Sequence, residues 1–206
     1  MNDVTHSTEA VSEVAVREVE RRRRAYPTGV WGVALLIATE VTLFATLFAT
    51  YFYLRSNTVD WPPHGVEEPK VALPLVLNGI LALTSVPMFL AARGVRTARL
   101  ASARWLILLA VVVQGAFFGI QLHEMASDLD KFTPQGSAYG SIYFTMLGVH
   151  QAHVTLGILL NVWLLGKLVG GLTQYRATAT RAIALYWHFV NLMAICTVLI
   201  QVSPSL

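Results

Sequence analysis

Five long apolar runs follow one another along the chain, separated by shorter segments that contain charged residues. The runs lie at about residues 30–54, 71–92, 105–122, 139–166 and 182–202. Each is close to or longer than the ~20 residues with which a helix crosses a hydrocarbon core of ~30 Å. The pattern predicts an all-α integral membrane bundle of five transmembrane helices. No internal repeat is visible, so residues 26–206 are expected to form one five-helix domain.

The segment before the first run has a different character. Residues 1–25 mix acidic residues with an arginine run, Arg21–Arg24, and contain few bulky apolar residues. Such a composition predicts a flexible N-terminal tail. The first apolar run is too long for a signal peptide and has no small-residue cleavage motif after it, so we expect it to be retained.

Composition agrees with a membrane protein. Of the 206 residues, 55% are hydrophobic and only 13% are charged, which is too little charge to cover a soluble domain of this size. The single cysteine, Cys196, excludes an intrachain disulfide and a cysteine-based metal site. The net charge of +3 is no sign of nucleic-acid binding, because the basic residues are distributed by loop.

That distribution predicts the topology. Twelve of the fifteen Lys and Arg residues lie before the first run, between the second and third, or between the fourth and fifth. The other connections carry only Arg55, Lys70 and Lys131, among several acidic residues. The positive-inside rule then places the N-terminus in the cytoplasm and the C-terminus outside.

Four ionisable side chains fall inside the apolar runs. Glu40 is ten residues into the first run, ~15 Å deep at 1.5 Å per residue, where an ionised carboxylate costs ~2.5–3.5 kcal/mol. His150 and His153 share one helix face, at depths of ~17 and ~21 Å, and His188 lies ~9 Å from the inner end of the last run. These residues are expected to form a polar cluster across the first, fourth and fifth helices. It is compatible with a metal or haem site, a proton relay, or interhelical hydrogen bonds.

Other residues suggest packing and lipid contacts. Gly148, Ala152 and Gly157 are expected to let helix backbones approach closely, and Asn78 and Gln114 to make hydrogen bonds between helices. Cationic and indole side chains near the inner ends of the runs predict a seat for an anionic phospholipid headgroup. These residues are Arg104, Trp105, Arg181 and Trp187.

Several segments, in order, resemble subunit III of the haem-copper respiratory oxidases. They are "TEVTLFATLFATYFYLRS", "WPPHG", "GIQLHE", "YGSIYFTMLGVHQAHVTLG" and "YWHFVN". The resemblance runs from about Val30 to the C-terminus. The chain is similar to the five-helix form of the family, which lacks the first two helices of the seven-helix form.

The resemblance implies an accessory subunit in the inner (plasma) membrane of a bacterium. Haem and copper are then carried by partner subunits, so this chain is expected to hold no cofactor and His150 and His153 no metal. The implied partners are subunit I, subunit II, other respiratory subunits and bound phospholipid. The implied role is to support proton uptake and durability during oxygen reduction. Asn191 stands where the family commonly has Asp, which weakens a proton-relay interpretation there.

Three alternatives remain at this point. Within the family, the chain resembles a quinol-oxidase subunit III or a nitric oxide reductase accessory protein as well, because the electron donor is bound by other subunits. From a different class, an independent proton-coupled transporter would use Glu40 and the histidines. The absence of a repeat and of broken helices in the first and fourth runs argues against that transporter.

Overall fold

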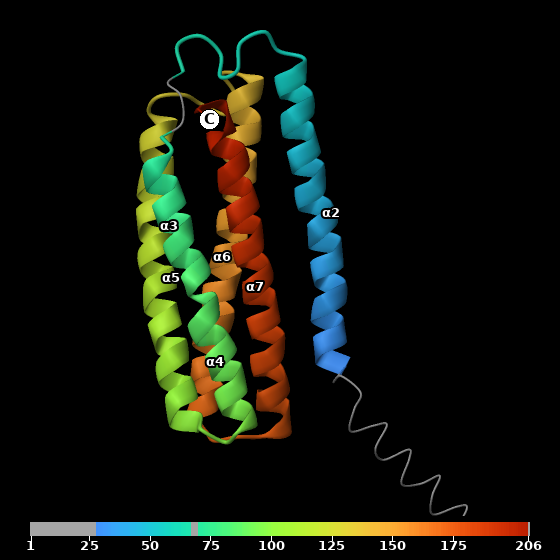
Figure 1. The fold of residues 1–206 in the computed structure, drawn as a ribbon, viewed down its shortest axis with the longest axis vertical. Coiled ribbons are helices and arrows are strands. Elements are labelled where there is room, and N and C mark those ends of the chain that lie inside the picture. Colours follow the sequence, from blue (N-terminus) through green and yellow to red (C-terminus); the bar gives the residue numbers. More distant parts are fainter. Residues whose placement is uncertain (1–27, 67–69, 206) are drawn as a thin grey trace, which may run out of the picture.

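Long α-helices joined by short connections make up the computed structural model, which describes residues 28–66 and 70–205 (Figure 1). The helices are α2 (Thr28–Ser56), α3 (Ala72–Leu83), α4 (Ser85–Arg96), α5 (Leu100–Leu129), α6 (Ala138–Val169) and α7 (Gln174–Val202), followed by a 3₁₀ turn at Ser203–Ser205. Because α3 and α4 together form one interrupted span, the described residues contain five helical segments that are long and apolar enough to cross a membrane. The all-α, five-span prediction is confirmed. The predicted tail at residues 1–25 lies outside the described residues.

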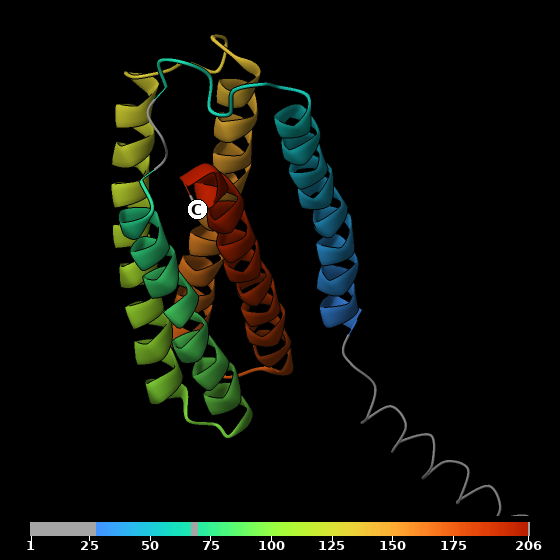
Figure 2. The same cartoon turned by 45° about the horizontal axis from the view of Figure 1, so that its top comes forward.

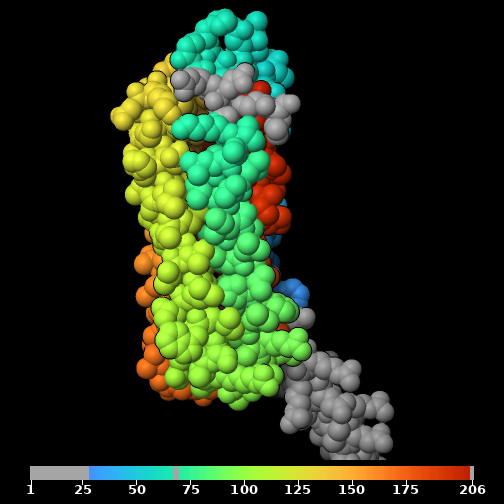
Figure 3. Space-filling view, turned by 60° about the vertical axis from the view of Figure 1, so that its left-hand side comes forward, coloured from blue at the N-terminus to red at the C-terminus, as the bar shows by residue number. Residues whose placement is uncertain are grey.

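Helix α7 lies at the centre of the bundle. It contacts α2, α3, α4 and α6, and it is the most buried of the five spans. Helices α3, α4 and α5 lie side by side on the face shown in Figure 3. Helix α2 stands at the side of the bundle and contacts only α6 and α7 among the described helices (Figures 1 and 2). Most of its surface is therefore open to lipid or to another protein.

The helices are longer than the apolar runs. Helix α5, for example, continues to Leu129 through Glu124 and Asp128. Side-chain caps fix two of the starts: Ser137 accepts a hydrogen bond from the Gly140 amide (3.0 Å), and Thr173 accepts one from the Arg176 amide (3.2 Å). Hydropathy marks the part of a helix that can lie in hydrocarbon, whereas caps mark where the helix begins.

The second span is interrupted at Thr84, between α3 and α4. Pro87 lies three residues later. A proline inside a helix donates no backbone hydrogen bond, and its ring clashes with the carbonyl four residues before it, here that of Leu83. The Thr84 hydroxyl donates to the Leu81 carbonyl at the break. We attribute the interruption to Pro87.

Helices α6 and α7 pack closely against each other at Gly157. A Cβ atom on Gly157 would lie 2.5 Å from the Trp187 ring, and the Trp187 indole donates to the Thr84 hydroxyl (2.8 Å). The packing role expected of Gly157 is thus confirmed. That expectation is wrong for Gly148, whose missing side chain would meet no atom within 4 Å, and for Ala152, which is exposed.

Buried amides join two of the helices. Asn161 of α6 donates to the side-chain oxygen of Gln114 of α5 (3.1 Å), and both residues are fully buried. The interhelical bond expected of Gln114 is confirmed. Asn78, by contrast, donates to the Pro74 carbonyl of its own helix (2.8 Å). Its expected interhelical role is therefore not observed among the described residues.

Candidate functional site

The bundle has two chemically different ends. The basic end, at the start of α2, the α4–α5 turn and the α6–α7 turn, carries Arg93, Arg96, Arg99, Arg104, Lys167, Arg176 and Arg181. The loop end, at the last turn of α2, residues 57–71, residues 130–137 and the C-terminus, carries three basic residues, Arg55, Lys70 and Lys131, among several acidic ones. The unequal distribution of Lys and Arg among the loops, predicted from sequence, thus gives the two ends of the bundle different charge.

An interhelical ion pair or hydrogen bond joins α2 to α6 between these ends. Nε2 of His153 lies 3.0 Å from Oε2 of Glu40, and both side chains are largely buried. Nδ1 of the same imidazole lies 2.7 Å from the Val149 carbonyl oxygen. The Phe44 and Phe189 rings pack against the imidazole. The predicted polar cluster contained both His150 and His153, and of these two the structure joins only His153 to Glu40.

The hydrogen-bond pattern fixes the number of protons in this pair. A carbonyl oxygen only accepts, so Nδ1 of His153 must carry a proton. One further proton lies between Nε2 and Glu40, either on the carboxyl group or on the imidazole. In both cases the pair as a whole is neutral. A neutral pair avoids most of the cost of placing a single charge in a membrane helix.

His150 lies one turn from His153 but has a different environment. It is buried, and neither of its ring nitrogens has a hydrogen-bond partner among the described residues. His150 therefore belongs to the same region of α6 without being joined to Glu40. The structure shows it as a buried polar group in the core, separate from the Glu40–His153 pair.

His188 points to a different part of the molecule. The Tyr186 hydroxyl donates to the His153 carbonyl (3.2 Å), so the Tyr186 face of α7 is turned toward the pair. Two residues further on, His188 is rotated by about 200° around the helix. It lines a cavity of about 610 Å³ at the basic end. The prediction that His188 belongs to the polar cluster is therefore wrong: its depth matches that of His153, but its direction around α7 turns it toward the basic-end cavity.

This basic-end cavity lies between α4 and α7. Its polar lining is cationic or ionisable, from Arg93, Arg96, Arg181 and His188, with Thr97 beside them. Its apolar lining includes Phe89 and Leu185, which are exposed on the outer surface of the bundle. A polar anion with an attached apolar chain fits this combination of charge and exposed apolar surface. Arg93 and Arg96 were not among the residues predicted to contact lipid, although their spacing of three residues on one helix face was visible in the sequence.

The four residues expected to bind a lipid headgroup do not lie together in the structure. Arg181 lines the basic-end cavity, and Trp105 is 71% exposed. Arg104 instead donates to the Leu168 carbonyl (2.7 Å), where it caps the end of α6. Trp187 is fully buried in the core, because its bulk fills the space above Gly157. Trp187 therefore does not lie at the surface where a lipid would bind.

The donor set does not suit a metal ion. Both nitrogens of His153 are engaged, one with Val149 and one with Glu40. Among residues 28–66 and 70–205, no three His, Cys, Asp or Glu side chains are grouped so as to hold a metal ion. The chemistry open to the pair is hydrogen bonding and sharing of one proton.

Taken together, these features define a multi-pass α-helical membrane protein with a neutral glutamate–histidine pair inside and a cationic cavity at one end. Comparison with known families gives a more specific result. Residues 21–202 match the family model described as "Cytochrome c oxidase subunit III". The chain belongs to this family, whose members are subunits III of haem-copper oxidases.

Individual relatives carry two kinds of name. The chain is 30% identical over 169 residues to "Cytochrome bo(3) ubiquinol oxidase subunit 3" of Pseudomonas aeruginosa, covering 81% of this chain and 80% of the relative. It is 27% identical over 165 residues to "Cytochrome c oxidase subunit 3" of Bacillus subtilis, covering 79% of each. It is 31% identical over 173 residues to "Probable cytochrome c oxidase subunit 3" of Nocardia farcinica, covering 79% and 81%. At this level of identity the relatives are divided between cytochrome c and quinol oxidases.

Proposed function

We propose that the chain is a non-catalytic accessory subunit of a proton-pumping terminal oxidase in the inner membrane of a bacterium. It packs on the catalytic subunit I, alongside subunit II, and supports proton uptake and stability of the complex during oxygen reduction. The observation that carries the proposal is the family match over residues 21–202. The engaged nitrogens of His153 support a structural rather than a metal-binding role for the "GVHQAHV" segment.

The electron donor is proposed to be cytochrome c, with quinol as the second candidate. Relatives named as cytochrome c oxidase subunits include those of Bacillus subtilis and Nocardia farcinica. The relative from Pseudomonas aeruginosa is named as a ubiquinol oxidase subunit, which favours the alternative. An oxygen-consumption assay on the complex with reduced cytochrome c and, separately, with reduced quinol distinguishes the two.

The basic-end cavity is proposed to hold the headgroup of an anionic phospholipid on the cytoplasmic side. Arg93, Arg96 and Arg181 line it, and guanidinium groups bind phosphate oxygens through charge-assisted hydrogen bonds. Substitution of Arg93 by Gln should reduce the retained phosphatidylglycerol. Arg99→Gln is the matched control, because Arg99 is exposed at the same end but does not line the cavity.

An affinity tag on this chain tests the accessory role. Gentle isolation should bring haem-containing subunits with it, and the complex should consume oxygen. The chain washed free of its partners should show neither a haem spectrum nor stoichiometric copper, zinc or iron. A tightly bound metal or haem in the washed chain, or a tagged preparation without haem proteins, would contradict the proposal.

A further inference from the structure

Three aromatic rings are in contact at the loop end of the bundle, away from the Glu40–His153 pair and the basic-end cavity. Trp61, in the connection between α2 and α3, packs edge to face on Tyr139 of α6, with ring centroids 5.1 Å apart. Tyr139 stacks on Tyr143, one turn further along α6, at 5.8 Å. These separations are typical of aromatic rings in contact. Because electron tunnelling weakens steeply with distance, three touching rings of oxidisable type form a continuous route for an electron.

Trp61 is the end of this route that a soluble oxidant can reach. Its side chain is half-buried, so part of the ring is accessible. Its indole N–H, however, is buried without an acceptor in the part of the chain that the structure describes. Loss of one electron from Trp61 therefore leaves a radical cation that keeps its proton. A buried charge without a partner is costly, so the electron vacancy is expected to move to another ring.

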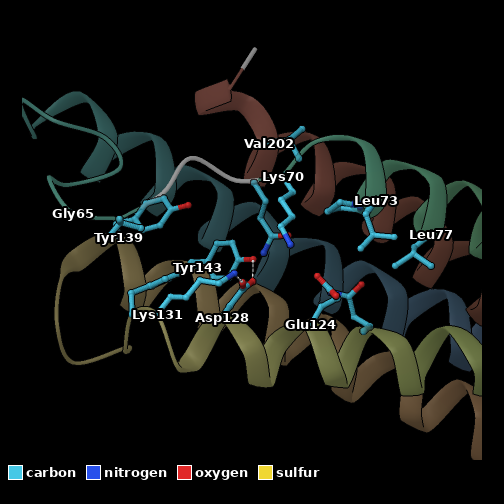
Figure 4. A pocket seen from close by; sticks show the side chains of 15 residues that line it. Gly65, Lys70, Leu73, Leu77, Glu124, Asp128, Lys131, Tyr139, Tyr143 and Val202 are labelled. Atoms are coloured by element: carbon cyan, nitrogen blue, oxygen red, sulfur yellow. Dashed lines mark hydrogen bonds and ion pairs between the residues drawn. The ribbon is translucent and has the colours of Figure 1, made fainter.

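Tyr143, at the other end, has a proton acceptor. Its hydroxyl donates to Oδ2 of Asp128 (2.9 Å), and Nζ of Lys131 lies 3.1 Å from Oδ1 of the same carboxylate. Figure 4 shows these three side chains joined. A phenol becomes strongly acidic when it is oxidised, and the Asp128 carboxylate is placed to take the proton. Tyr143 can therefore lose an electron and a proton together and form a neutral radical.

We propose that Tyr143 is a one-electron donor that intercepts oxidising radicals at the loop end, with Trp61 and Tyr139 as the relay. The oxidant belongs to the class of peroxyl radicals, which form where oxygen meets lipid. It takes one electron from Trp61 and one proton from solvent, and so becomes a hydroperoxide. The vacancy passes through the Tyr139 ring to Tyr143, whose phenolic proton moves to Asp128. The products are one hydroperoxide, one neutral tyrosyl radical and one protonated carboxyl group.

A cavity gives the radical access to water and to a reductant. Tyr143 and Asp128 both line a space of about 210 Å³, where α3, α5, α6 and α7 meet (Figure 4). A polar cavity of this size is large enough to hold water. A soluble one-electron reductant restores the phenol, because it supplies the electron while Asp128 returns the proton. The site can then react again.

Flash oxidation of the intact assembly tests the proposal. The complex is captured through a tag on this chain and mixed with a ruthenium(II) polypyridyl complex and a cobalt(III) electron acceptor. A laser flash generates ruthenium(III), which is a one-electron oxidant, and rapid freezing followed by EPR spectroscopy detects the radicals. Difluorotyrosine incorporated in place of Tyr143 gives fluorine splittings. These distinguish a radical at this position from one at any other tyrosine of the assembly.

Matched variants separate electron transfer from packing. Trp61→Phe removes the oxidisable ring, whereas Trp61→Tyr also changes the packing but keeps a ring that can be oxidised. Asp128→Asn keeps an oxygen that accepts the hydrogen bond but is not a base. The control is Tyr53→Phe, which removes a phenol at the same end of the bundle that is 67% exposed and is not one of the three rings.

The otherwise unchanged chain and Tyr53→Phe should form the fluorine-split radical, more slowly in D2O because a proton moves with the electron. Trp61→Phe should slow its formation about tenfold, equivalent to a barrier raised by ~1.4 kcal/mol, and Trp61→Tyr should form it faster than Trp61→Phe. Asp128→Asn should lower the yield about tenfold, as expected when a charge-assisted contact is lost, and the remaining yield should rise with pH because the proton must go to solvent.

Two results would overturn the proposal. The first is the absence of a fluorine-split radical in the otherwise unchanged chain, a result that does not require any variant to assemble. The second is equal formation of the radical in Trp61→Phe and Trp61→Tyr together with an unchanged yield in Asp128→Asn. That result would show that the rings and the carboxylate only pack the loop onto α6.

Discussion

Removal of the Glu40 carboxyl group should destabilise the bundle through His153. In the wild-type chain the two side chains share one proton across 3.0 Å, and Nδ1 of His153 is held by Val149. Glu40→Gln keeps a donor at this position, because the amide can donate to Nε2 of a neutral imidazole. Glu40→Leu leaves Nε2 without a partner. We therefore expect Glu40→Gln to be tolerated better than Glu40→Leu.

The magnitude follows from the position of the pair. Both side chains are largely but not completely buried, with 24% of Glu40 and 14% of His153 exposed. Interhelical hydrogen bonds in membrane proteins contribute ~0.6 kcal/mol on average and up to ~1.7 kcal/mol. An unpaired buried acceptor adds a desolvation cost of ~1–3 kcal/mol. Glu40→Leu should thus cost about 1–3 kcal/mol, and Glu40→Gln less than about 1 kcal/mol.

A double-mutant cycle measures the interaction itself. Glu40→Leu, His153→Leu and the double variant are compared by unfolding with SDS in mixed micelles, followed by tryptophan fluorescence. The double variant should be less destabilised than the sum of the two single variants by about 0.6–1.7 kcal/mol. Independent sites add to within ~0.3–0.5 kcal/mol. Additivity within that range, or equal losses in Glu40→Gln and Glu40→Leu, would refute the hydrogen-bonding role of Glu40.

Three further predictions concern packing and topology. Gly157→Ala should destabilise the bundle by about 1–3 kcal/mol, because the new Cβ would overlap the Trp187 ring. Gly148→Ala, at an open position, should be nearly neutral in the same SDS titration. Arg104→Gln should increase hydrogen exchange at the end of α6, because the Leu168 carbonyl loses its charged donor; unchanged exchange there would show that the cap is dispensable. A C-terminal reporter that is active only in the cytoplasm should stay silent, and a signal would mean that the charge distribution has been misinterpreted.

The spans were predictable from sequence because a membrane imposes length and apolarity on each helix. The interruption at Thr84 was not predicted, although Pro87 was the visible signal for it. The depth of each ionisable residue also follows from sequence, at 1.5 Å per residue. The depths calculated in this way place Glu40 and His153 near the same level of the membrane, and the structure shows the two side chains in contact.

Direction around a helix was harder to predict, because most spans are apolar on nearly every side. His188 has a depth close to that of His153 but faces the basic-end cavity. Trp187 was expected near the surface and is buried. In a lipid environment hydropathy does not distinguish a core-facing position from a lipid-facing one. The position of Trp187 depends instead on a specific neighbour: Gly157 has no side chain, and this leaves the space in the core that the Trp187 ring fills.

The position of α2 has a consequence for biosynthesis. Its contacts are with α6 and α7, the last helices to be made, and 113 residues separate Glu40 from His153. At ~5–20 residues per second, the ribosome needs roughly 6–23 s to synthesise that length of chain. During this interval α2 must reside in the membrane with its carboxyl group lacking the His153 partner. The apolarity of the first span therefore has to secure insertion by itself, before the fold can supply the neutralising histidine.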